Sequence, residues 1–206
     1  MSESLTITGI DPGVRIVGVD TLEAEMPTGE IEVVPGSIQQ IRLMDKTLNE
    51  RMFYLTYVLS GFLNNWCPDL IVIEQPWGSQ GAVKIHSAII NAIASGVAIS
   101  AASRFVYGYH GESDQDMGKS RVRLVYPSQW QRYMKVKGKD ACVASVKAKF
   151  NLKPPLKPSE HHAADAIKIA EYGAIMMRLG KWVIGGENAN SLKMVKIAKR
   201  IYGSQK

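Results

Sequence analysis

The pattern of apolar and polar positions predicts a sheet that begins with two strands in residues 4–20. Apolar residues alternate with threonines at positions 5–10, and positions 14–19 are again apolar and rich in β-branched side chains, as is typical of strands. Asp11-Pro12-Gly13 lies between them and has the composition of a tight turn. Asp11 would therefore lie where a strand ends, although an aspartate that only begins a turn has the same pattern.

The next segments predict a mixed sheet covered by a helix. Residues 30–38 form a third strand, in which Pro35-Gly36 marks a bend or bulge, and residues 45–66 carry a helical stripe of apolar side chains. Residues 69–74 are apolar until Glu74, which is the pattern of a strand buried on both faces. Because this strand follows a crossover helix, we expect it to run parallel to the first strand.

The second half of the chain is predicted to consist mainly of helices. The expected elements are a helix at 82–105, a loop at 107–120, a strand at 121–126, helices from near Pro127 and Ala141, a helix capped by Ser159, and a basic amphipathic helix at 191–202. The helix at 82–105 is rich in small side chains, so it can pack closely on the sheet or on a second copy of the chain.

Asp11 and Glu74 are predicted to meet at one edge of the sheet. If their strands are neighbouring and parallel, both carboxylates emerge at the same edge. Two acids so placed repel each other unless a cation lies between them. The pair therefore predicts a metal site and not only a turn.

The helix after Ser159 offers two further ligands. His162 and Asp165 are three residues apart, so they share a helix face, and the neighbouring alanines leave that face uncrowded. They could act only as capping residues or interact with the helix dipole at the N-terminus of the helix. Beside two acids at strand ends, however, they indicate a set of metal ligands. His161 lies about 100° around the helix and is expected to face solvent.

Charge and composition narrow the class of partner. The chain has 206 residues, of which 46% are hydrophobic, and its 25 Lys and Arg against 19 Asp and Glu give a net charge of +6. These values fit one globular domain and favour a polyanionic partner. Lysines gather in residues 135–157 and again in residues 193–206. A solvated helix face is the alternative explanation for each of these two clusters.

Two features bear on localisation. No stretch reaches the ~18 continuous apolar residues of a membrane span, and the first residues have neither a basic start nor an apolar signal core. Cys67 and Cys142 stand far apart, which fits a reducing compartment. We expect a cytoplasmic protein with no membrane partner, with an organelle or a phage-infected host cell as alternatives.

Three motifs in this order resemble the RuvC family of Holliday-junction resolvases in the RNase H-like nuclease superfamily. They are Gly9-Ile10-Asp11-Pro12-Gly13, Ile73-Glu74-Gln75, and Ala163-Ala164-Asp165-Ala166 preceded by His162, and the resemblance runs from about residue 5 to about residue 177. It implies an α/β RNase H-like fold with a mixed five-stranded sheet, an antiparallel meander plus parallel strands, flanked by helices. It also implies a homodimeric, Mg²⁺- or Mn²⁺-dependent endonuclease that nicks two opposed strands of a four-way DNA junction.

The resemblance also assigns roles to single residues. The expected catalytic and metal-binding residues are Asp11, Glu74, His162 and Asp165. Trp77 falls where the family has an aromatic residue that probes the opened junction. The family places a lysine at the start of the helix near Ala141, where this chain has Asp140 with Lys139 adjacent. The residues expected to contact nucleic acid are Trp77, Arg15, Gln75, Lys84, Lys135, Lys137 and Lys139.

Residues 1–180 are expected to form the nuclease domain and residues 181–206 a basic C-terminal helical extension. Two competing functions fit the same residues. One is an RNase H-like nuclease that acts on other branched DNA or on RNA, and the other is a junction-binding protein without catalytic activity. Cleavage of different branched substrates with and without Mg²⁺ separates them.

Overall fold

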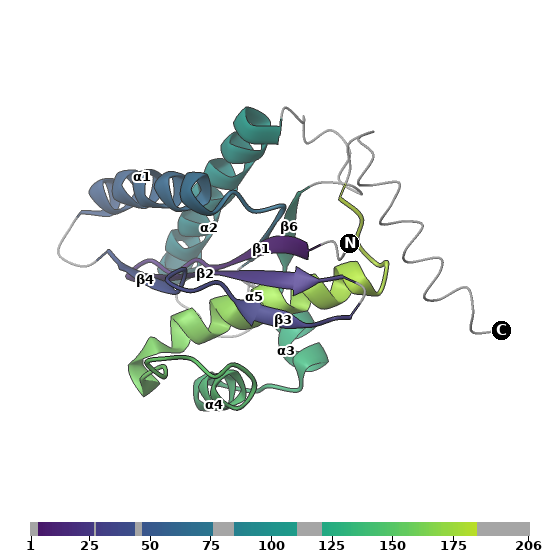
Figure 1. The fold of residues 1–206 in the computed structure, drawn as a ribbon. Coiled ribbons are helices and arrows are strands. Elements are labelled where there is room, and N and C mark those ends of the chain that lie inside the picture. The colour runs from purple at the N-terminus through teal and green to yellow at the C-terminus, as the bar shows by residue number, and fades with distance from the viewer. Residues whose placement is uncertain (1–3, 27, 44–46, 76–84, 111–120, 185–206) are drawn as a thin grey trace.

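The computed structural model describes residues 4–26, 28–43, 47–75, 85–110 and 121–184. They form one sheet with helices on both faces (Figure 1). Helices α1 (Leu48–Trp66) and α2 (Ile85–His110) cover one face. Helix α5 (His161–Arg178) covers the other, with α3 (Pro127–Met134) and α4 (Lys139–Lys149) packed on the same side. A 3₁₀ helix, η1 (Pro158–Glu160), leads into α5.

The sheet combines antiparallel and parallel strands, as predicted. Its strands are β1 (Ser4–Asp11), β2 (Ile16–Glu25), β3 (Ile31–Val33), β4 (Gln39–Arg42), β5 (Leu70–Glu74) and β6 (Val122–Val125). The order across the sheet is β3-β2-β1-β5-β6, and β4 also pairs with β2. β2 runs antiparallel to β1, β3 and β4, whereas β5 runs parallel to β1 and β6 runs parallel to β5.

Two short strands share the outer edge of β2, where the sequence predicted one strand. β3 pairs with residues 22–24 of β2 and β4 pairs with residues 16–19. The sheet therefore has six strands in five positions. The bend at Pro35-Gly36 separates the two short strands, and Gly36 has a φ of 81°, a left-handed conformation that favours glycine.

The helix boundaries differ from the predictions at three points. α2 continues to His110, into the segment expected as a loop, and α4 begins at Lys139 instead of near Ala141. Ser159 is not the N-cap of α5, because it lies inside η1 and Glu160 precedes the helix. Pro158 begins the 3₁₀ turn, which passes directly into α5 without an extended capping residue.

Local interactions fix both ends of α1. Thr47 Oγ1 accepts the backbone N–H of Glu50 at 3.4 Å, while the Glu50 carboxylate accepts the backbone N–H of Thr47 at 2.7 Å, which is a capping box. Cys67 ends the helix in the left-handed conformation, with a φ of 43°. The predicted apolar stripe is buried against the sheet at Leu55 and Leu59, and each such side chain stabilises the fold by about 1.5–3 kcal/mol.

Within the residues that the structure describes, one helix is long and apolar enough to cross a membrane. It is Ala88–Tyr109 in α2, with a mean hydropathy of 1.5, and 39% of this stretch is buried in the fold. Ala98, Ala101 and Ala102 of this helix lie in the core beside α1. Since core helices often meet the same criteria, the finding is weak evidence for a membrane span, and the absence of a membrane partner stays a prediction.

The pleat of the sheet directs both strand-end acids toward α5. Ile7 packs in the core beside α5, whereas Ile10 and Ile73 pack in the core beside α1 and α2. Because successive residues face opposite sides of a sheet, Asp11 and Glu74 face α5. The pairing of Ile10 with Ile73 places the two acids level with each other. The predicted meeting of the strand ends is thus confirmed.

Two glycines allow α5 to approach the strands closely. A Cβ atom on Gly9 would collide with the backbone oxygen of Ala166, and one on Gly18 would collide with the backbone oxygen of His162. Both obstacles are backbone atoms, so a side chain at either position would displace the helix. The close approach brings the first turn of α5 to the end of β1.

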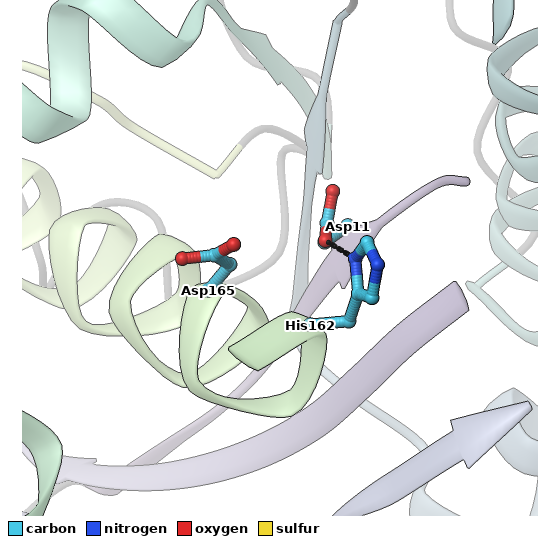
Figure 2. Close-up of side chains that lie close together, drawn as sticks. All are labelled: Asp11, His162 and Asp165. Atoms are coloured by element: carbon cyan, nitrogen blue, oxygen red, sulfur yellow. Dashed lines mark hydrogen bonds and ion pairs between the residues drawn. The ribbon is translucent and has the colours of Figure 1, made fainter. Parts of the chain in front are cut away.

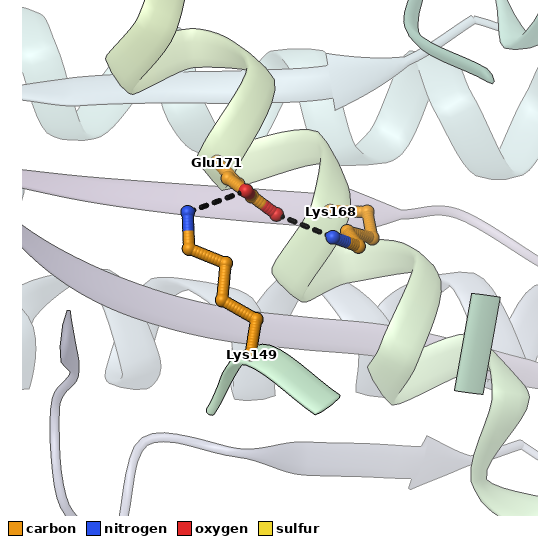
Figure 3. A network of polar contacts seen from close by, with 3 residues as sticks. All are labelled: Lys149, Lys168 and Glu171. Atoms are coloured by element: carbon orange, nitrogen blue, oxygen red, sulfur yellow. Dashed lines mark hydrogen bonds and ion pairs between the residues drawn. The ribbon is translucent and has the colours of Figure 1, made fainter. Parts of the chain in front are cut away.

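A buried charged network connects α4 to α5 (Figure 3). Glu171 accepts a hydrogen bond of 2.7 Å from Lys168 on its own helix and another of 2.7 Å from Lys149 on α4. The side chains of Lys168 and Glu171 are only 3% and 4% exposed. Buried charges are tolerated only when they are paired, so the network fixes how α4 sits against α5.

The segment after α5 also packs on the core. Trp182 contacts the ring of Tyr172 edge to face, with centroids 5.7 Å apart, and Ile184 is buried. The helix predicted at 191–202 lies outside the described residues. The domain boundary at residue 180 stays a prediction.

Asp20 of β2 is a buried carboxylic acid on the α5 side of the sheet. Ser37 Oγ lies 2.8 Å from its Oδ1, and its Oδ2 has no hydrogen-bond partner among the residues described. Burial raises the pKa of Asp20 to about 7, although hydrogen bonds from Ser37 and Thr21 act in the opposite direction. The folded protein therefore keeps a proton on Asp20 that the unfolded chain loses near pH ~4.

Asp20→Asn is expected to weaken the pH dependence of stability. Between pH ~4 and pH ~7 the free energy of unfolding of the wild type falls as the pH rises, because the unfolded chain binds fewer protons there than the folded protein. The amide cannot ionise, so from pH 5 to pH 8 the variant should gain about 2–3 kcal/mol relative to the wild type. Urea denaturation at both pH values measures this, with the exposed Glu32→Gln as control. Parallel pH profiles of Asp20→Asn and the wild type would refute the assignment.

Candidate active site

Asp11, His162 and Asp165 form a compact cluster where β1 ends and α5 begins (Figure 2). One possible ligand atom from each lies within 4.8 Å of the other two. Nδ1 of His162 lies 2.6 Å from Oδ2 of Asp11. Which of these two atoms donates the hydrogen bond depends on the tautomer of the imidazole ring. The predicted sharing of a helix face by His162 and Asp165 is confirmed.

Glu74 lies beside this cluster and is held by Trp130 of α3. The indole Nε1–H of Trp130 donates a hydrogen bond of 2.6 Å to Oε2 of Glu74. Glu74 lines the same cavity as Asp11 and His162, but it is not one of the three clustered residues. Trp130 was not predicted as a site residue, because no local pattern connects residues 56 positions apart.

Burial and mutual repulsion favour the protonated forms of two acids. The pKa of Glu74 is raised to about 8, first by burial and next by the charge of Asp11. The same two causes, in the same order, raise the pKa of Asp165 to about 6. A divalent cation would offset this repulsion and displace the protons. Carboxylates with one imidazole are a donor set that suits such a cation.

Cys142 of α4 forms a hydrogen bond with the side chain of Asp165. Its thiol is buried, and burial is the main cause of the raised pKa of this cysteine. The thiol therefore stays protonated and donates a hydrogen bond to the Asp165 carboxylate, which lowers the pKa of that acid. No local sequence pattern indicates this contact, because it depends on the packing of α4 on α5.

His161 was expected to face solvent, and the structure shows it half-buried. Its ring lies against that of His162, with centroids 4.3 Å apart, and both rings line the same cavity. Nε2 of His161 is buried and has no hydrogen-bond partner in the part of the chain that the structure describes. Burial, followed by the neighbouring His162, lowers the pKa of His161.

Three residues expected to contact nucleic acid lie around the strand ends. Arg15, in the turn between β1 and β2, and Lys139, at the start of α4, line the cavity beside Asp11. Gln75 directly follows β5, and its backbone N–H donates a hydrogen bond of 2.8 Å to Val125.

The other expected nucleic-acid contacts are more distant or undescribed. Lys135 and Lys137 are exposed between α3 and α4, and they are not among the cavity-lining residues that the structure describes. Trp77 and Lys84 lie outside the described residues, so their roles stay predictions.

Comparison with known proteins identifies the class and the family. The mixed sheet with helices on both faces is an RNase H-like fold. The family model described as "Crossover junction endodeoxyribonuclease RuvC" matches residues 7–116, more than half of the chain, and this region includes Asp11 and Glu74. The chain belongs to the RuvC family of crossover junction endodeoxyribonucleases, as the sequence motifs predicted.

Solved structures share the fold. A Thermus thermophilus RuvC in complex with a Holliday junction substrate is 21% identical with a TM-score of 0.65, covering 86% of this chain and 98% of that chain. Thermus thermophilus RuvC in a second structure is 20% identical with a TM-score of 0.64 and the same coverage. The yeast mitochondrial Holliday junction resolvase Ydc2 is 13% identical with a TM-score of 0.55, covering 85% of this chain and 80% of that chain. No curated protein sequence matches.

Family membership and fold together make this chain a junction-resolving nuclease, a Holliday-junction resolvase. The RNase H-like fold class that the sequence predicted is confirmed.

Proposed function

We propose that this resolvase hydrolyses phosphodiester bonds with a site made of Asp11, Glu74, His162 and Asp165. The observation that carries the proposal is the convergence of Asp11, His162 and Asp165 within 4.8 Å, with Glu74 lining the same cavity. A junction-binding protein without catalytic activity has no need of these buried, mutually repelling acids, because each is unfavourable without a cation.

The proposed cofactor is Mg²⁺ or Mn²⁺, held by Asp11, His162 and Asp165 with Glu74 as a further carboxylate. Divalent cations in such sites activate water and stabilise charge on the leaving oxygen. Trp130 fixes the Glu74 carboxylate through its N–H group. The contact with Asp11 orients the His162 ring, and a neutral His162 would act as a metal ligand or accept a proton from water.

The proposed substrate is a four-way DNA junction. Arg15 and Lys139 bring positive charge to the cavity that contains the acids, and the net charge of +6 supports binding to a polyanion. We further propose that Trp77 stacks on an unpaired base, which contributes ~1–3 kcal/mol in comparable sites. Lys84, Lys135, Lys137 and Gln75 complete the proposed contacts.

A panel of substrates tests the activity. Purified protein is incubated with a synthetic four-way junction, a flap, a linear duplex and an RNA–DNA hybrid, each with Mg²⁺, Mn²⁺ or EDTA. We expect paired nicks in the junction with either metal and none with EDTA. We also expect log K for junction binding to fall with log[salt], with a slope near −0.9 per phosphate contacted. Equal cutting of the flap would favour the wider branched-DNA function, and metal-independent binding without cutting would reject catalysis.

We propose that the protein works as a homodimer that pairs through α2. Ile89 and Ile93, one helical turn apart, are 54% and 38% exposed, and paired nicking of opposed strands needs two active sites. Ile93→Glu should shift the mass measured by sedimentation from dimer to monomer and abolish paired nicking. Phe53→Ser on α1, where Phe53 is 80% exposed, is the matched control. A monomeric wild type that still cuts in pairs would exclude this arrangement.

The proposed location is an intracellular reducing compartment such as the cytoplasm. Cys67 and Cys142 are both free thiols, and Cys142 must remain reduced to donate its hydrogen bond to Asp165.

A further inference from the structure

We propose that Arg51 binds the DNA backbone phosphate next to the one that is cut and thereby positions the cleaved strand. The inference rests on the proposed function, because it assigns a second phosphate position to the same site. Arg51 lies in the first turn of α1, and its side chain lines the cavity that also contains Asp11, Glu74 and His162.

The cavity is larger than a single phosphate and its cations require. Its volume is about 840 Å³, in the upper part of the ~300–1,000 Å³ range of pockets that hold drug-sized ligands. A strand entering such a cavity brings at least one flanking phosphate with it. That phosphate needs a positive partner, and Arg15, Arg51 and Lys139 are the arginine and lysine residues among the described residues that line the cavity.

Arg51 provides this partner from outside the acidic cluster. The acids come from β1, β5 and the start of α5, whereas Arg51 comes from α1 and Asn91 from α2. Guanidinium is charged at all relevant pH values and presents a planar pair of donors that matches two phosphate oxygens. Asn91 can add an amide donor on the same side.

The position of Arg51 in its helix explains why it reaches the cavity. Arg51, Leu55 and Leu59 are spaced four residues apart, so they form one stripe along α1. Leu55 and Leu59 are fully buried against the sheet. At Arg51 the same stripe reaches the strand ends, where the cavity opens.

The backbone that carries Arg51 is rigid. The capping box of Thr47 and Glu50 fixes the first turn of α1, and the N–H of Arg51 donates a hydrogen bond of 2.9 Å to Thr47. A side chain that begins on a fixed turn loses less freedom on binding than one on a loop, so it can hold a strand in register.

The first test compares Arg51→Ala and Arg51→Lys with Arg104→Ala, which removes an exposed arginine of α2 outside the cavity. Single-turnover cleavage of a four-way junction in Mg²⁺ should fall about 10- to 100-fold in Arg51→Ala, the loss typical of a charged hydrogen-bonding pair. Arg51→Lys should recover part of the rate, because the charge remains but the paired donors are lost. Arg104→Ala should stay close to the wild type.

The second test locates the phosphate. Junctions with one neutral methylphosphonate at each position flanking the cut are given to the wild type and to Arg51→Ala. At one position the methylphosphonate should slow cleavage by the wild type about 10- to 100-fold. The same methylphosphonate should hardly slow Arg51→Ala, because that variant already lacks the arginine that would contact the phosphate. For binding to the unmodified junction, the slope of log K against log[salt] should be shallower by about 0.9 in Arg51→Ala than in the wild type.

Two outcomes would overturn the inference. In the first, Arg51→Ala cleaves the junction as fast as Arg104→Ala. In the second, the methylphosphonate slows the wild type and Arg51→Ala equally at every position. Circular dichroism and Mn²⁺ titration calorimetry of Arg51→Ala without DNA should match the wild type. A loss of structure or metal binding would mean a structural role and would equally reject the phosphate contact. If the wild type itself cuts no junction, the proposed function fails, while the salt slope still tests the contact at Arg51.

Discussion

Asp11→Asn is expected to abolish junction cleavage while leaving junction binding largely intact. The substitution removes a negative charge from the centre of the cluster, where Asp11 contacts His162 and raises the pKa values of Glu74 and Asp165. Metal binding should fail, and the single-turnover rate should drop at least ~1,000-fold. The amide keeps the size of the side chain, so the DNA surface hardly changes.

The measurements are cleavage in Mg²⁺ and Mn²⁺, junction affinity in EDTA, and Mn²⁺ titration calorimetry without DNA. Glu32→Gln removes an exposed acid of β3 and is the matched control, with wild-type values expected in all three. Mg²⁺-dependent nicking by Asp11→Asn at a rate near that of the wild type would show that the active site lies elsewhere.

Glu171→Leu is expected to have the largest effect on stability. Lys168 would lose the acceptor that lies 2.7 Å from its ammonium group, and this lysine is only 3% exposed. Leaving a buried charge without its partner typically destabilises a protein by about 3–5 kcal/mol. For a domain of this size we expect the melting temperature to fall by ~10 °C.

A double substitution distinguishes the missing partner from lost packing. In Lys168→Met with Glu171→Leu both buried charges are replaced by apolar groups, so most of the lost stability should return. Lys149→Met alone should cost little, because Lys149 is 41% exposed and water can replace its contact. If the double variant melts as low as Glu171→Leu, the network is not the source of the effect.

The network also connects stability to the active site. α4 carries Lys139 to the cavity and Cys142 to Asp165, and its other end is joined to α5 through Lys149 and Glu171. A variant that folds but lacks the contact between Lys149 and Glu171 should position α4 less precisely on α5. Cys142 would then orient the Asp165 side chain less well. Weaker Mn²⁺ binding by Glu171→Leu at a temperature where it is fully folded would show this connection.

The local sequence determined most of the elements and the main ligands. Strand alternation in 4–20, the apolar run before Glu74 and the stripe of α1 depend on neighbouring residues, so each was predicted close to its observed position. The site residues Asp11 and Glu74 followed from the rule that parallel strands end at the same edge of a sheet. His162 and Asp165 followed from helical periodicity.

Tertiary structure alone decided the contacts that hold and surround those ligands. Trp130 on Glu74, Cys142 on Asp165 and Arg51 at the cavity join residues that are far apart in the sequence, and their pairing depends on how the helices pack on the sheet. The partial burial of His161 depends on the same packing. Periodicity gives the direction of a side chain around its own helix, but its burial depends on what packs against that helix, and no local pattern contains that information.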